Sequence, residues 1–92
     1  MPNLLVQCKV GPGLFKTEYL VSVPPDAPGA RFYVDRADVR VHKAPVEGES
    51  VHGYVLAYWI EDRNDEAIIE MTGTPVAGGL RILVPKALTT AA

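Results

Sequence analysis

The fold is decided by Ser50-Val-His-Gly-Tyr-Val-Leu-Ala-Tyr-Trp-Ile-Glu-Asp62, which contains the longest uncharged run of the chain and its only Trp. Side chains of a strand alternate between two faces, and both alternating sets of this run are largely apolar. The run is rich in β-branched and aromatic residues, includes Gly53 and shows no 3.6-residue apolar stripe, so it favours a strand over a helix. We predict the central strand of a small β-domain, with a bulge or bend at Gly53.

Length and composition predict one folded domain over residues 1–92. The chain is 48% hydrophobic and 22% charged, with a net charge of −2. These values are typical of a globular domain and create no global field that would draw nucleic acid or an anionic membrane. The only cysteine, Cys8, excludes an internal disulfide. The start of the chain does not resemble a signal peptide, and no run approaches the roughly 20 apolar residues of a membrane helix, so we expect a cytoplasmic protein.

Short alternating segments separated by Gly and Pro loops predict an all-β fold. The alternation shifts by one residue at 35–38, which predicts a short helical turn or a bulge there. Arg63-Asn64 is expected to form a two-residue hairpin loop, 74–79 a longer loop and 85–88 a terminal turn, with the last four residues frayed. The predicted strands are residues 4–10, 15–23, 31–34, 50–62, 66–72 and 80–84.

Residues 6–39 align without a gap on residues 56–89, fifty positions later. In this alignment the inward positions of the first segment are expected to stay inward in the second. Val6, Cys8 and Val10 fall on Leu56, Tyr58 and Ile60. We therefore predict two three-stranded meanders, related by a pseudo-two-fold axis and closed into one six-stranded barrel or sandwich. Any two alternating meanders of similar length would also align in this way, so the absence of a duplication stays an alternative. The identities are Pro25/Pro75, Ala27/Ala77, Gly29/Gly79, Arg31/Arg81, Val34/Val84 and Ala37/Ala87.

The segment Arg31-Phe-Tyr-Val-Asp-Arg-Ala-Asp-Val-Arg-Val41 resembles the strand, short helical turn and strand found late in SH3-like small barrels. Leu80-Arg-Ile-Leu-Val-Pro-Lys-Ala-Leu88 resembles the same unit, but the chain stops before a following strand. The resemblance covers about a fifth of the chain and includes no diagnostic motif. It implies a small barrel, of a kind that often binds peptides or nucleic acids, although a fold does not by itself fix a function.

The titratable residues do not assemble into a catalytic or metal-binding motif. His42 and His52 are ten residues apart, with no second pair of ligands at a zinc spacing, so they are interpreted as histidines at strand ends. Cys8 is expected on the inward face, where free cysteines usually behave as small apolar residues. The acidic side chains near the predicted hairpin are interpreted as a solvated turn. We predict a protein without enzymatic activity, cofactor or metal.

Trp59, Ile68 and Leu83 form the first candidate binding surface. A hairpin loop at Arg63-Asn64 would place Trp59 opposite Ile68, with Leu83 beside them on the neighbouring strand. The equivalent positions of the first meander are polar, so the second meander is expected to expose an apolar face. Such a face usually binds a partner, and a symmetric homodimer is the simplest one. The alternative is that residues 39–46 or the C-terminal tail cover Trp59.

Two other candidate surfaces involve a small molecule and nucleic acid. Tyr54 and Tyr58 could contribute to a ligand site at a barrel mouth. Arg31, Tyr33, Arg36 and Arg40 lie in a segment, 31–43, with a net charge of +2 and could hold a single strand. The next segment, 44–70, has a net charge of −6 and would repel phosphates. Nucleic acid is therefore the least favoured of the three classes of partner.

Overall fold

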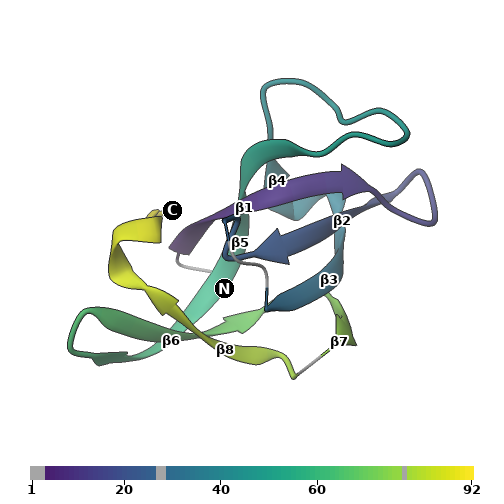
Figure 1. Cartoon of the computed structure of the whole chain (residues 1–92). Helices are drawn as coiled ribbons and strands as arrows, with labels where there is room; N and C mark the ends of the chain where they lie inside the picture. Colours follow the sequence, from purple (N-terminus) through teal and green to yellow (C-terminus); the bar gives the residue numbers. More distant parts are fainter. Residues whose placement is uncertain (1–3, 27–28, 78) are drawn as a thin grey trace.

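The computed structural model describes residues 4–26, 29–77 and 79–92 as one antiparallel sheet that curls into a half-barrel (Figure 1). No α-helix occurs in these ranges, which contain nine strands and two short 3₁₀ turns. The all-β prediction is therefore confirmed. The strands are β1 Leu4–Pro12, β2 Glu18–Val23, β3 Ala30–Asp35, β4 Val39–Arg40, β5 Val51–Arg63, β6 Glu66–Met71, β7 Thr74–Ala77, β8 Arg81–Pro85 and β9 Thr89–Ala91, and the turns are η1 Arg36–Asp38 and η2 Lys86–Leu88.

The strands follow the order β7-β3-β2-β1-β5-β6-β8 across the sheet, with β1 and β5 paired along its centre. Six of the strands were predicted from alternation. Of the three short ones, β7 occupies most of the expected 74–79 loop and pairs with β3, and β9 pairs with β1 where frayed residues were expected. These two pairings join residues far apart in sequence, so local alternation does not reveal them.

The two halves of the chain exchange their last strands. β4 closes the first half but pairs with β5, and β9 closes the second half but pairs with β1. Each half also contains a meander, β1-β2-β3 or β5-β6-β8, followed by a 3₁₀ turn. The exchanged strands and the long β1–β5 pairing therefore join both halves to a single sheet.

One face of the sheet forms the core. The core side chains are Val6, Cys8, Val10, Tyr19, Val21, Val23, Ala30, Phe32, Val34, Val39, Val55, Ala57, Ala67, Ile69, Met71 and Val84. In β5 the buried residues are odd-numbered, whereas the fifty-residue alignment placed Leu56, Tyr58 and Ile60 inward. That prediction is wrong, because Val55 lies opposite Val6 in β1 and therefore shares its face.

A bulge at Ile60 separates two registers of the β5–β6 hairpin. Trp59 lies opposite Ile69, but the next paired residue, Glu61, lies opposite Ile68. The two-residue loop is Asn64-Asp65 between the paired Arg63 and Glu66, and Asn64 has a φ of 56°. The predicted loop at Arg63-Asn64 is therefore one residue out of place. Asn tolerates a positive φ better than most residues, which suits it to the first position of such a loop.

Gly53 is required by close packing and is not a bulge. It pairs regularly with Cys8, and a Cβ atom there would lie 2.8 Å from the carbonyl oxygen of Arg40 and 2.6 Å from Cγ1 of Val41. The chain that leaves β4 thus crosses directly over β5. Only a residue without a side chain allows backbone and neighbouring side chains to approach so closely.

Candidate functional site

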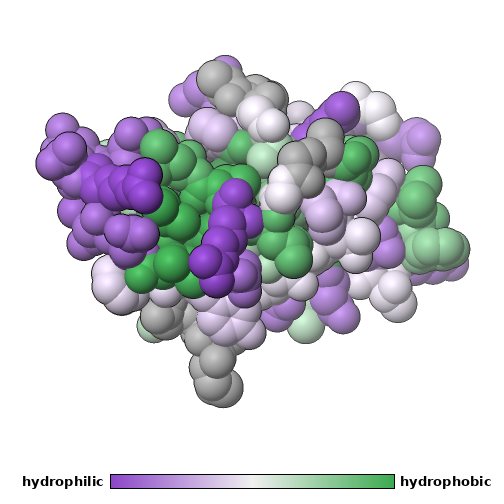
Figure 2. All heavy atoms as spheres, turned by 90° about the horizontal axis from the view of Figure 1, so that it is seen from below, coloured by the Kyte–Doolittle hydropathy of each residue, from purple (hydrophilic) through white to green (hydrophobic). Residues whose placement is uncertain are grey.

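Four apolar residues line a shallow hollow on the outer face of β5, β6 and β8, and one of them, Ile82, also packs against the core. Ile68 lies opposite Leu83, and the bulge brings Ile60 to the same hollow, which has a volume of about 440 Å³. Leu83 is 46% exposed. We call Ile60, Ile68 and Leu83 the β6–β8 patch. Figure 2, which views the molecule from below Figure 1, shows an apolar area bordered by hydrophilic side chains on that face.

Charged side chains surround the β6–β8 patch. Glu61, Arg63 and Arg81 also line the hollow. Nε of Arg81 lies 3.0 Å from Oε1 of Glu70, and Nε of Arg63 lies 3.9 Å from Oε2 of Glu61. Exposed ion pairs of this kind contribute little to stability, about 0–1 kcal/mol each. Their arrangement, an apolar centre within a charged rim, is typical of protein interfaces.

Trp59 does not belong to the patch, so the predicted grouping of Trp59 with Ile68 and Leu83 is wrong. The bulge leaves Trp59 opposite Ile69, on the core-lining face, where its side chain lies at the exposed end of the sheet. Its Nε1 donates a hydrogen bond of 2.9 Å to Oδ1 of Asp62. Nζ of Lys86 lies 3.3 Å from the other carboxylate oxygen. The hydrogen bond from Trp59, and then Lys86, lower the pKa of Asp62 below its ordinary value.

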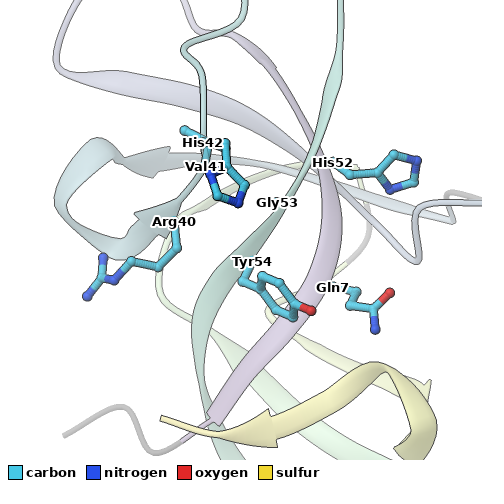
Figure 3. A pocket seen from close by; sticks show the side chains of 7 residues that line it. All are labelled: Gln7, Arg40, Val41, His42, His52, Gly53 and Tyr54. Carbon is cyan, nitrogen blue, oxygen red and sulfur yellow. The ribbon is translucent and has the colours of Figure 1, made fainter.

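A second hollow, of about 400 Å³, lies where β4 crosses β5. Tyr54 and Gln7 face each other in it, with the Tyr54 hydroxyl directed toward Gln7 (Figure 3). His42 points into the same space, whereas the side chain of Arg40 extends away from Tyr54. Nη1 of Arg40 instead donates to the carbonyl oxygen of Ala37 at 2.7 Å. The lining residues are Gln7, Arg40, Val41, His42, His52, Gly53 and Tyr54.

The structure separates the two predicted ligand-binding tyrosines. Tyr54 lines the hollow beside β4, but Tyr58 lies opposite Glu70 in β6 and is not among the lining residues. Both belong to the even-numbered set of β5, which faces away from the core. Neither tyrosine therefore lies in a barrel interior, and only Tyr54 remains part of a candidate site.

The four residues predicted to bind nucleic acid lie on three consecutive elements, β3, η1 and β4. Arg31 and Tyr33 share the outer face of β3. Arg36 belongs to η1, and its guanidinium lies 4.5 Å from the ring centroid of Tyr19, a core residue. Arg40 lies beside β5 and bonds to the end of η1. Of the four, Arg36 is therefore the one whose side chain lies over a core residue, which its spacing in sequence did not show.

Cys8 lies in the core without solvent exposure. Burial raises the pKa of its thiol to about 12, so the thiol is protonated at neutral pH and is not a nucleophile there. Within the described ranges, no cluster of three His, Cys, Asp or Glu residues has metal-binding geometry. The same ranges include no helix with the length and hydropathy needed to cross a membrane.

Sequence reasoning missed Ile60 and Gln7 as site residues. Because both faces of β5 are apolar, the sequence gives no local signal of the bulge at Ile60. Gln7 enters the second hollow only through the β1–β5 register. Comparisons with protein-family models, with curated proteins and with solved structures find no match to this chain.

Proposed function

We propose that this protein is a non-enzymatic binding module that takes a protein partner on the β6–β8 patch. The observation that carries the proposal is the direct pairing of Ile68 with the half-exposed Leu83, beside Ile60 and within a charged rim. Full burial of one Leu or Ile side chain is worth about 1.5–3 kcal/mol. Covering three half-buried side chains therefore supplies a useful share of the binding free energy of a modest interface.

The sheet supports the patch on rigid elements. Ala67 and Ile69, the residues before and after Ile68 in β6, are packed in the core. Their packing fixes the position of the backbone that carries Ile68. Leu83 has the fully buried Val84 as its neighbour in β8. A surface held in this way loses little conformational entropy on binding.

A photo-crosslinking side chain at position 83 tests the proposal in cells of the source organism. We expect a covalent adduct with a protein when the crosslinker replaces Leu83, identified by mass spectrometry. The matched control carries the crosslinker at Leu14, which is 71% exposed in the turn between β1 and β2. Equal adduct yields at the two positions, or none at 83, would overturn the proposal.

The resemblance to SH3-like barrels supports the same class of function. β3, η1 and β4 form the strand, 3₁₀ turn and strand expected from Arg31–Val41. We propose that the half-barrel is a distant variant of that architecture, acting in the cytoplasm.

Small-molecule binding in the hollow between β4 and β5 is a second candidate, favoured by the facing polar groups of Tyr54 and Gln7. A ligand bound there would raise the melting temperature by mass action. A thermal-shift screen of metabolites tests this, with Tyr54→Ala as the variant that loses the shift. A shift that survives in Tyr54→Ala would place the ligand elsewhere.

A further inference from the structure

The backbone of β8 has one hydrogen-bonded edge and one open edge. The amide of Met71 donates to the carbonyl of Leu80, and the amide of Lys86 donates to the carbonyl of Asp65, both at 2.8 Å. Both bonds belong to the β6–β8 register. In an antiparallel pair, alternate residues bond to the same neighbour, so the even-numbered residues of β8 face β6. Arg81, Leu83 and Pro85 therefore direct their backbone groups away from β6, where no other strand pairs within the described ranges.

The matching edge in the other half of the chain is covered. β3 has the position in its meander that β8 has in the second, and β7 pairs along the outer edge of β3. In the first half of the chain, the segment that corresponds to β7 starts fifty positions earlier, at Pro24-Pro25. Its residues 24–26 form no strand. Proline has no amide hydrogen to donate to a ladder. This chain therefore covers the β3 edge and leaves the β8 edge open.

We infer that the open edge of β8 pairs in antiparallel fashion with β8 of a second copy of this chain, extending the sheet through a two-fold axis at Leu83. The inference deepens the proposed function and rests on it, because it names the partner of the β6–β8 patch. In this arrangement the two Leu83 residues form a hydrogen-bonded pair, each donating its amide hydrogen to the other's carbonyl oxygen. The self-pairing satisfies the outward backbone groups of Leu83 in both copies.

The side chains favour this partner, because the register joins the two patches. Across the extended sheet the central row reads Ile68, Leu83, then Leu83 and Ile68 of the second copy, with Glu61 at each end. Such cross-strand apolar pairs contribute about 0.2–1 kcal/mol each. The apolar row is thereby continuous, and the like charges of Glu61 lie far apart.

The neighbouring row is complementary in charge. Arg81 would lie opposite Pro85 of the second copy, and the next residue in that row is Glu66. On its own side Arg81 already contacts Glu70 at 3.0 Å. Each arginine would therefore lie between two carboxylates of different copies. Pro85 lacks an amide hydrogen, so it also ends the ladder at this point and limits pairing to the Leu83-centred register.

Light scattering coupled to size exclusion measures the first consequence. We expect wild-type protein at high concentration to have twice the 10.0 kDa mass of one chain. Leu83→Lys would place two like charges on the axis, so this variant should have the single-chain mass with an unchanged strand spectrum. Leu14→Lys, which changes an exposed Leu far from β8 in sequence, should keep the doubled mass. If Leu83→Lys fails to fold, Leu83→Pro replaces it, because the amide hydrogen that proline removes there faces away from β6.

Cysteine pairing tests the register itself. Hydrogen-bonded antiparallel partners have Cα atoms about 5.5 Å apart, which suits a disulfide. Leu83→Cys should therefore form a linked dimer under mild oxidation. Arg81→Cys should not, because its copies would be four residues apart along the strand, about 13 Å. The native Cys8 is buried and should remain reduced.

Three results would overturn the inference. These are a wild-type monomer at every concentration, a doubled mass that survives in whichever of the Leu83→Lys and Leu83→Pro variants is used, and equal linkage of Arg81→Cys and Leu83→Cys. The proposed function fails separately. A monomer that still forms adducts with a different protein at position 83 keeps the binding module and removes the second copy, whereas the absence of any adduct at 83 removes both.

Discussion

Gly53 shows how one residue determines where a strand can cross. A methyl group there would approach the Arg40 carbonyl and the Val41 side chain, and Cγ2 of Val10 lies only 3.1 Å from the same point. Because backbone is among the obstacles, β4 must shift away from β5. We expect Gly53→Ala to lower the free energy of unfolding by about 1–3 kcal/mol, measured by urea denaturation. Gly29→Ala, where no atom lies within 4 Å, is the control. Equal midpoints for both variants would contradict the packing argument.

Asp62 gives the protein a small dependence on acid. Its pKa is lowered in the folded state, by the Trp59 hydrogen bond and then by Lys86. A lowered pKa means that the stabilisation is complete above the unfolded value of 3.8 and is lost as the pH falls through the folded pKa. Asp62→Asn retains an oxygen that can accept from Trp59 but has no charge. The difference in urea midpoint between wild type and Asp62→Asn should therefore shrink as the pH falls below 3.8. The fluorescence of Trp59 is the signal that reports unfolding in these titrations. A difference that is the same at every pH would exclude this contribution.

At the scale of elements, alternation predicted the six longer strands but not the register of β5. Alternation in β1 and β2 is clean because one face is core, as Val6 and Val21 show. β5 is apolar on both faces, so its sequence does not distinguish the inward set, and the wrong set was chosen. The bulge at Ile60 then changed the patch, replacing Trp59 by Ile60. The other two patch residues, Ile68 and Leu83, were predicted to be neighbours, and they are, because β6 and β8 pair without interruption.

Deletion of Ile60 tests the bulge as an element. Without it, Trp59 faces the core side, Glu61 the outer side and Asp62 the core side again, which is regular alternation. We expect the deletion variant to fold, with a loss of only about 1–2 kcal/mol. Deletion of Leu56, which lies between the core residues Val55 and Ala57, should prevent folding because it moves one set of side chains to the wrong face. Circular dichroism and thermal melting distinguish the two deletion variants. An equal loss of folded structure in both would show that Ile60 is not an extra residue inserted into a regular strand.

At the scale of the whole molecule, the two halves share local features at their 3₁₀ turns. Each 3₁₀ turn starts with the same hydrogen bond, from Arg36 to the carbonyl of Thr17 and from Lys86 to that of Asp65. The residues before the turns, Asp35 and Pro85, have φ and ψ of −55° and 136° and of −58° and 134°. The β-registers match only with small gaps, which is why the ungapped alignment failed in β5. A common origin of the halves stays a prediction.

The exchanged strands predict that neither half folds alone. In a fragment ending at residue 46, β1 lacks both β5 and β9, and β4 has no strand to pair with. In a fragment starting at residue 47, β5 lacks β1 and β4, and β9 has no partner. We expect each fragment to show no cooperative melting, and an equimolar mixture to recover the strand spectrum and the melting transition of the intact chain, weakened by dilution because association is now bimolecular. A matched pair cut at residue 64, inside the loop of the β5–β6 hairpin, leaves β1, β4 and all of β5 in one fragment. A fragment 1–46 that melts cooperatively as a monomer would show that the halves fold independently. The pairing of β4 with β5 and of β9 with β1 would then not be required for folding.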